Sequence, residues 1–211
     1  MLVIAPYAVS VPLAFVVGER LEAATASGLI ALALAPGALV APALVAAAGG
    51  RRSDMAGALL LGTAILSFVL VVTRPSASTV ALTAAQAFAV ASIGAGALPQ
   101  VRDRILGPLR WAGYLAALVV FLLAIAAGPP IDAVNVIVAL AGTLVTLAVA
   151  GVVAIALRRD VLSAAAAAGT RDPIVAIALA WATGGSEATA VPIVSAAILG
   201  ILAAALVLRR R

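Results

Sequence analysis

Apolar runs of about 17 to 25 residues, the length of a helix that crosses a bilayer, follow one another along the chain. Short polar segments separate these runs and hold most of the charged residues. No run alternates apolar and polar positions with the period of two that a membrane β-strand shows. The pattern therefore predicts an all-α, polytopic membrane helix bundle.

The apolar runs predict about eight transmembrane segments in one domain that covers residues 1–211. A single helix through the last 36 residues of this pattern, 173–208, would be about 54 Å long, so this stretch is predicted to cross twice, the first time briefly. Gly18–Ser27 is predicted to be an aqueous loop, and Arg158–Asp172 the longest polar connection. The six other predicted spans are 2–17, 28–49, 55–72, 79–99, 111–128 and 133–157.

Two of these segments contain residues that interrupt a helix. Pro36 and Gly37 lie inside the second segment, and the last part of the chain is predicted to break at Thr183–Gly185 and again at Pro192. Inside a membrane, the carbonyl groups that a proline frees need partners in protein or in a water-lined cavity. Two discontinuous helices in comparable places of the two halves are typical of a transporter with its substrate site between them.

Composition supports the membrane assignment. Hydrophobic residues make up 65% of the chain and charged residues 10%, with a mean hydropathy of +1.27, whereas soluble domains are about one quarter charged. With eight crossings, Arg20 and Arg74 fall on one side of the membrane and the other 11 arginines on the opposite side. The positive-inside rule then places both termini in the cytoplasm, in an inner (plasma) membrane. The arginines form no contiguous basic arm, so no nucleic-acid partner is predicted.

The candidate chemistry is limited because Cys, His and Lys are absent from the sequence. Thiol nucleophiles, imidazole metal ligands and Schiff-base lysines are therefore excluded, and neither an enzyme nor a metal or cofactor site is predicted. The polar residues within the apolar segments and the residues at the breaks are the candidate pathway residues: Pro36, Gly37, Thr63, Ser67, Thr183, Gly184, Ser186 and Glu187.

Glu187 is the candidate with two open interpretations. It is a carboxylate within an otherwise apolar run, so it could face a cavity in the membrane and exchange a proton. Alternatively, Ser186 is the N-cap of the last helix and Glu187 lies in its first turn, within an external turn. Thr63 and Ser67 share one helix face, where packing is the simpler role.

Three ordered motifs, Gly28–Ala38, Ser53–Leu59 and Ala182–Glu187, resemble landmarks of the bile acid/sodium symporter family. They correspond to the broken fourth helix, the start of the fifth helix and the broken ninth helix. The resemblance implies two inverted repeats, here 28–72 and 133–208, whose broken helices cross near the midplane. It also implies that the chain begins within the family's third helix and is an N-terminally truncated relative.

The departures from the family pattern bear on ion coupling. Ala41 and Pro42 stand where the family has Ser and Asn, and Ala182 and Ser186 stand where it has the sodium-binding Glu and Gln. Sodium coupling therefore cannot be carried over, and Glu187, at the family's Asn position, is a candidate for proton coupling.

The resulting prediction is a secondary transporter of a small organic anion or similar solute that works by alternating access, with half-helix N-termini facing the anion. Its coupling ion is H⁺ or Na⁺, its partners are the lipid bilayer and the solute, and a homodimer would complete the missing helices. The alternative is a degenerate or incomplete family member that does not transport.

Overall fold

The computed structural model describes residues 4–35, 118, 121–158, 161, 165 and 169–208, and these residues are helical with short connections and no strand. The predicted all-α class is confirmed for this part of the chain. The predicted spans between residues 36 and 117, with Pro36, Gly37, Thr63 and Ser67, lie outside the described residues. The elements are α1 (Ile4–Gly18), α2 (Ala23–Leu34), α7 (Ala133–Ala156), α9 (Pro173–Gly184), the 3₁₀ helix η2 (Glu187–Thr189) and α10 (Ala190–Leu208).

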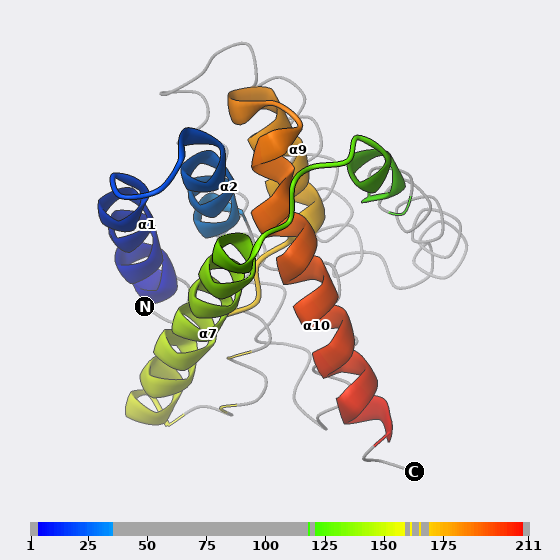
Figure 1. Ribbon diagram of the computed structural model, residues 1–211. Coiled ribbons are helices and arrows are strands. Elements are labelled where there is room, and N and C mark those ends of the chain that lie inside the picture. The colour runs from blue at the N-terminus through cyan, green and yellow to red at the C-terminus, as the bar shows by residue number, and fades with distance from the viewer. Residues whose placement is uncertain are drawn as a thin grey trace, which may run out of the picture.

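Two antiparallel helix hairpins and one long helix form the described bundle (Figure 1). The first hairpin is α1 with α2, and the second is α9 with α10, joined through η2. The tips of both hairpins lie toward the top of Figure 1, and α7 begins below them, close to the first turn of α2. Buried side chains of α2, α9 and α10 meet in the centre, where Leu32, Ala176 and Val191 belong to one apolar cluster.

The loop between α1 and α2 is shorter than the sequence predicts. Gly18–Ser27 is predicted to be an aqueous loop, but helix α2 already begins at Ala23. The reason is a tertiary contact, because the buried Thr25 hydroxyl donates a hydrogen bond of 3.2 Å to Oδ1 of Asn135 on α7. Residues that look polar enough for a loop therefore form the first turn and a half of a packed helix.

Helix α7 is the one described helix that is long and apolar enough to cross a membrane. It has 24 residues and begins after the N-cap Asp132, whose carboxylate accepts from the backbone N–H of Asn135 at 2.8 Å. The predicted span 133–157 is thereby confirmed as a helix. At 15, 12 and 12 residues, α1, α2 and α9 are shorter than the roughly 20 residues of a full crossing. Eight crossings and the inverted repeat stay predictions.

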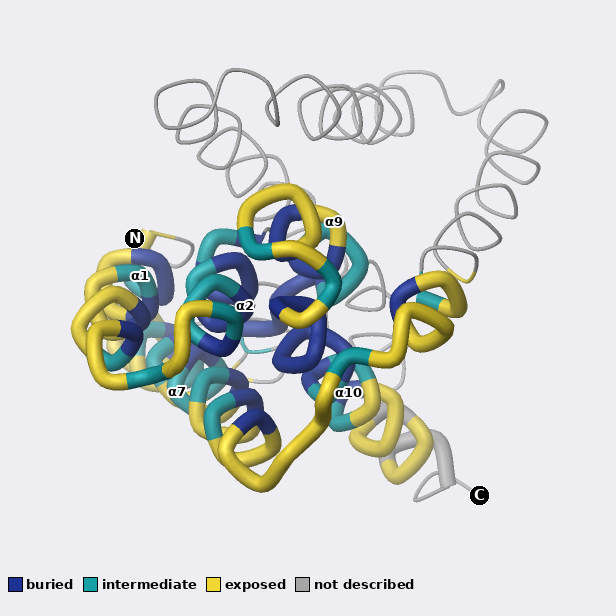
Figure 2. Tube along the Cα trace, turned by 45° about the horizontal axis from the view of Figure 1, so that its top comes forward, coloured by how far each residue is buried: buried dark blue, intermediate teal, exposed yellow. Residues whose placement is uncertain are grey.

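The outward faces of the described helices are apolar. Val152, Ile155 and Ile201 expose 65%, 66% and 69% of their surface, and Figure 2 shows the exposed residues on the outer faces with the buried residues between the helices. A soluble protein rarely leaves such extended apolar surface in water. This surface and the length of α7 support association with a membrane.

The second hairpin shows how local signals place helix ends. Helix α9 begins with Pro173 after the N-cap Asp172, whose Oδ1 accepts from the N–H groups of Ile174 and Val175 at 2.9 and 3.2 Å. It ends at Gly184, and Gly185 has a φ of 77°, a left-handed conformation that favours glycine. The predicted break at this point is therefore a chain reversal in the structure.

The predicted break at Pro192 is wrong. Helix α10 runs without interruption from Ala190 to Leu208. Pro192 is the third residue of α10, a position at which the backbone N–H has no partner within an α-helix. Proline lacks this N–H, so its presence there removes no helical hydrogen bond.

The hairpin tip is held against α2 by two glycines. A Cβ on Gly28 would collide with the carbonyl oxygen of Ala188, and a Cβ on Gly184 would lie 2.8 Å from the Cβ of Ser27. Small residues let membrane helices approach this closely. The contact fixes where α2 lies relative to the start of α10.

Candidate functional site

A buried arginine lies where the two hairpins meet. Arg171 is 3% exposed and directly precedes the N-cap of α9. The guanidinium carbon stands 3.8 Å from the ring centroid of Tyr7 on α1, a cation–π contact. One terminal nitrogen donates to the hydroxyl of Ser10 at 3.3 Å, and the other approaches the carbonyl oxygen of Ala35 at 3.5 Å.

The surroundings of Arg171 leave much of its hydrogen-bonding capacity unused. A guanidinium has five N–H donors, but only these two long contacts are made, and the Nε atom is buried without a partner in the described part of the chain. The carbonyl of Ala35 is also shared, because it accepts a shorter bond of 2.9 Å from the Tyr7 hydroxyl. Tyr7, Ser10 and Ala35 therefore offer partial negative charge but no anion.

The charge on Arg171 persists despite its burial. Arginine stays protonated in proteins even when it is buried, because the guanidinium ion is a very weak acid. A buried charge without a counter-ion is unfavourable by several kcal/mol. Within the described residues, no carboxylate forms an ion pair with it, so the site is chemically suited to receive an anion.

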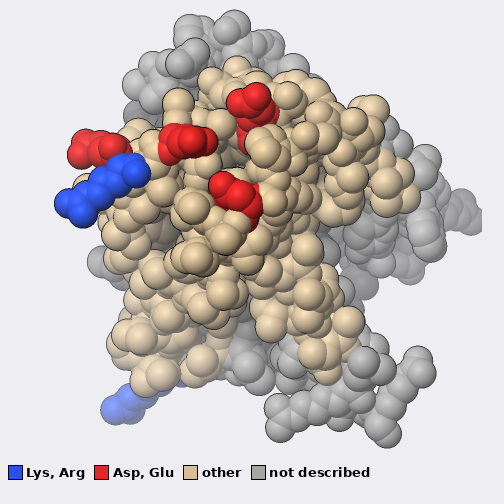
Figure 3. Space-filling view, viewed as in Figure 1, with Lys and Arg blue, Asp and Glu red and all other residues tan. Residues whose placement is uncertain are grey.

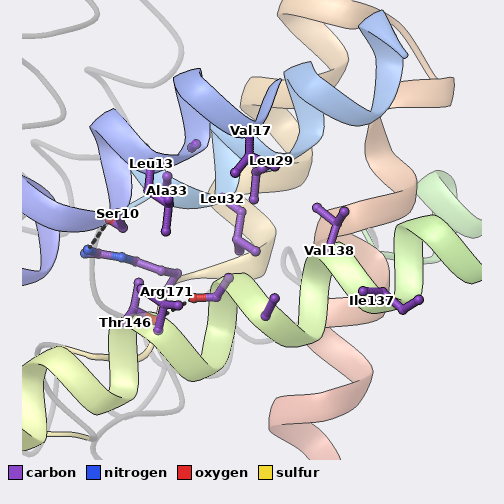
Figure 4. Close-up of a pocket in the computed structure, with 14 residues that line it drawn as sticks. Ser10, Leu13, Val17, Leu29, Leu32, Ala33, Ile137, Val138, Thr146 and Arg171 are labelled. Atoms are coloured by element: carbon purple, nitrogen blue, oxygen red, sulfur yellow. Dashed lines mark hydrogen bonds between the residues drawn. The ribbon is translucent and has the colours of Figure 1, made fainter. Parts of the chain in front are cut away.

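A cavity of about 230 Å³ extends from Arg171 between α1, α2 and α7. Ser10, Thr146 and Arg171 are its polar residues, and the Thr146 hydroxyl is turned back to the carbonyl oxygen of Thr143 at 2.9 Å. The rest of the lining is apolar, as Figure 4 shows. It consists of Leu13, Ala14, Val17, Leu29, Leu32, Ala33, Ile137, Val138, Ala141, Gly142 and Val145.

The cavity is closed at one end and open at the side. Arg171 and Thr146 at its polar end are 3% and 2% exposed, whereas Leu13 and Ile137 are 42% and 65% exposed. Leu13 lies on α1 and Ile137 on α7, so the opening is the gap between these two helices. An anion at Arg171 would be shielded from water, with its remaining atoms facing apolar side chains.

The predicted site residues that the structure describes gather elsewhere, at the tip of the second hairpin. Thr183 is exposed and bonds back to the carbonyl of Leu179 at 2.9 Å. Gly184 ends α9, and the carbonyl of the half-buried Ser186 accepts from the Thr189 hydroxyl at 2.6 Å. None of these residues lines the cavity beside Arg171.

Glu187 is exposed in η2 at this tip. Acidic side chains gather toward this end of the molecule, as Figure 3 shows, and the exposed acids of the described chain are Glu19, Glu22, Asp132 and Glu187. The Ser186 side chain makes no capping bond. The exposed position of Glu187 favours the interpretation as an external turn. The part of that interpretation in which the Ser186 side chain caps the helix is not seen.

Arg171 itself is the main residue that sequence reasoning misplaced. It is predicted to lie in a polar connection among the cytoplasmic arginines, but the structure buries it. At the start of α9, Asp172 already accepts from the N–H groups of Ile174 and Val175, and the predicted anion contact with half-helix N-termini stays a prediction. The pair Asp172–Pro173 was the sequence signal for this burial. It predicts the start of a helix, and Arg171 is then separated from an apolar segment by only one residue.

Comparisons with known proteins do not identify the chain. A scan against protein-family models finds no match, and a search of curated proteins finds none either. The resemblance to the bile acid/sodium symporters therefore depends on the order of the three motifs alone.

Proposed function

We propose that this chain is a secondary transporter, or part of one, that carries a small organic anion by alternating access. The observation that supports it most is the buried Arg171, whose Nε has no partner in the described part of the chain and whose side chain lines a cavity with apolar walls. Arginine binds carboxylates and related oxyanions through two parallel hydrogen bonds. A buried ionisable residue in a membrane bundle is a functional-site candidate, here for a solute that it binds.

The arrangement of short helices supports the same proposal. Helix α2 ends at Leu34, directly before Ala35 and Pro36, and α9 begins at Pro173. Arg171 contacts Ala35, so a helix end and a helix start meet at one charged group inside the bundle. Transporter sites commonly use discontinuous helices of this kind near the middle of the membrane.

The location and the coupling ion belong to the proposal as well. We place the protein in the inner membrane with both termini in the cytoplasm, which is supported by the arginine distribution and by α7 as a helix of spanning length. H⁺ or Na⁺ is the proposed coupling ion. The exposure of Glu187 gives a proton relay through that residue little support.

One observation favours a second candidate function. Arg171 already bridges α1 and α2 through Tyr7, Ser10 and Ala35. A cation at the C-terminal end of a helix is stabilising, so Arg171 could be a structural clamp in a family member that no longer transports. The two candidates differ in whether an added anion is bound.

Transport can be measured with hexanesulfonate, whose head group stays ionised and so does not cross a bilayer unaided. We expect saturable uptake of the labelled anion into proteoliposomes, reduced at least about tenfold by Arg171→Gln, because truncating one partner of a buried charge pair costs about 2–5 kcal/mol. Arg158→Gln is the matched control, since Arg158 is exposed, and it should stay within about twofold of the wild type. Uptake no faster than in protein-free liposomes would refute transport of this class of anion.

A further inference from the structure

The cavity has the shape of a site for an amphiphile. Its three polar residues, Ser10, Thr146 and Arg171, lie at one end, and nearly all of the surface that lines it is apolar. At about 230 Å³ it is smaller than the roughly 300–1,000 Å³ of pockets that enclose a drug-sized ligand. A ligand held at Arg171 can therefore be enclosed only in part, and the rest of it must leave through the opening.

The opening leads to the apolar outer surface of the bundle. We call the exposed lining residues Leu13, Ile137 and Ala141 the mouth. Their neighbours on the same outer faces, such as Val16 on α1 and Leu144 on α7, are 60% and 54% exposed. In a membrane this surface borders acyl chains, so the mouth opens sideways into lipid.

The length of the cavity matches a short alkyl chain. Its lining on α1 reaches from Ser10 to Val17, seven residues or about 10 Å along the helix axis. The lining on α7 reaches from Thr146 to Ile137 in the same direction, because α1 and α7 run antiparallel (Figure 1). Several methylene groups in a row can lie along these walls, because the lining residues of α1 and α7 beyond Ser10 and Thr146 are all apolar.

Building on the proposed function, we infer that the ligand is a single-chain amphiphilic anion that enters from the bilayer through the mouth. One oxyanion head group pairs with the single guanidinium of Arg171, and one unbranched alkyl chain lies along Leu13, Leu29 and Ile137. A monoanion matches the one charge available at the polar end. A flexible chain, rather than a rigid ring system, fits the narrow enclosed part and the lateral opening.

A chain-length series tests the inference. Butane-, hexane- and octanesulfonate are titrated by calorimetry into the protein in phosphatidylcholine nanodiscs, with Arg171→Gln nanodiscs as the measure of lipid partitioning alone. After subtraction of the signal from the Arg171→Gln nanodiscs, the affinity of the protein for the sulfonate should rise about fourfold for each added methylene group, as expected for apolar burial. Naphthalenesulfonate should bind at least about tenfold more weakly than octanesulfonate.

The two proposals fail separately in this experiment. Equal affinities along the series, or tight binding of naphthalenesulfonate, would overturn the single-chain ligand and leave an Arg171-dependent anion transporter standing. Binding and uptake that are the same in the wild type and in Arg171→Gln would instead refute the proposed function itself.

The entry route has its own test. Ala141→Trp places a large side chain in the mouth, whereas Val152→Trp adds the same group at an exposed position of α7 that does not line the cavity. Octanesulfonate binding should fall at least about tenfold in the first variant and less than twofold in the second. An octanesulfonate with a terminal photoreactive group should label α1 or α7 near the mouth, and labelling confined to α9 or α10 would overturn the route.

Discussion

The contact between α2 and the tip of the second hairpin predicts that Gly28→Ala destabilises the protein. A methyl group at this position would collide with the carbonyl oxygen of Ala188 and lie 3.2 Å from Cβ of Val191. The carbonyl belongs to the backbone, so it cannot turn away as the end of a flexible side chain can. Relief requires that α2 and η2 move apart.

The size of the effect follows from two opposing contributions. Overpacking of this kind destabilises by about 1–3 kcal/mol, and replacing a helical glycine with alanine stabilises by about 0.5–1 kcal/mol. The net loss is therefore within about 0–2.5 kcal/mol and centred near about 1 kcal/mol. For a protein of this size, about 1 kcal/mol changes the melting temperature by about 2–4 °C, so a fall of about that size is expected.

Thermal unfolding of the detergent-purified protein, followed by far-ultraviolet circular dichroism, measures this change. Gly200→Ala is the matched control, because Gly200 is also inside a helix and a Cβ there would meet no atom within 4 Å. That variant should melt slightly above the wild type. If Gly28→Ala melts at or above the wild-type temperature as well, α2 does not lie against η2 as described.

Two further predictions concern polar residues in the helices. Glu187→Gln should leave the pH profile of hexanesulfonate uptake unchanged, because Glu187 is exposed at the hairpin tip; a shifted profile would restore its role in proton coupling. Thr143 and Ser195 are buried on α7 and α10 with their hydroxyl oxygens 3.1 Å apart. A double-mutant cycle with Thr143→Val and Ser195→Ala should give a coupling energy of about 0.6 kcal/mol in unfolding titrations, typical of membrane proteins, and additive losses would mean that the two hydroxyls do not interact.

The Arg171 site does not lie where the family resemblance predicts the ion ligands. The motif at Ala182–Glu187 places the candidate ion ligands at the second break, but in the structure that break is an exposed chain reversal. The first break, by contrast, directly follows Ala35, which contacts Arg171. The first break itself, at Pro36 and Gly37, lies outside the described residues, and the cavity lies next to the end of α2 that precedes it.

Helix boundaries were predictable where nearby residues decide them. The span of α7 follows from Asp132 as a cap and an unbroken apolar run, and the start of α9 follows from Asp172 and Pro173. The end of α9 follows from Gly184 and Gly185. In each case the deciding interactions are backbone hydrogen bonds within about one helical turn, so the sequence by itself contains the information.

Tertiary structure decided the features that join distant segments. Residues 23–27 became helical because Thr25 meets Asn135, and Arg171 became buried because Tyr7, Ser10 and Ala35 converge on it from the other hairpin. No local sequence pattern predicts such contacts, because they depend on how whole helices pack against one another. The sequence determined an apolar helical protein with interrupted segments, and only the packing of the two hairpins with α7 placed a guanidinium at the end of an apolar cavity.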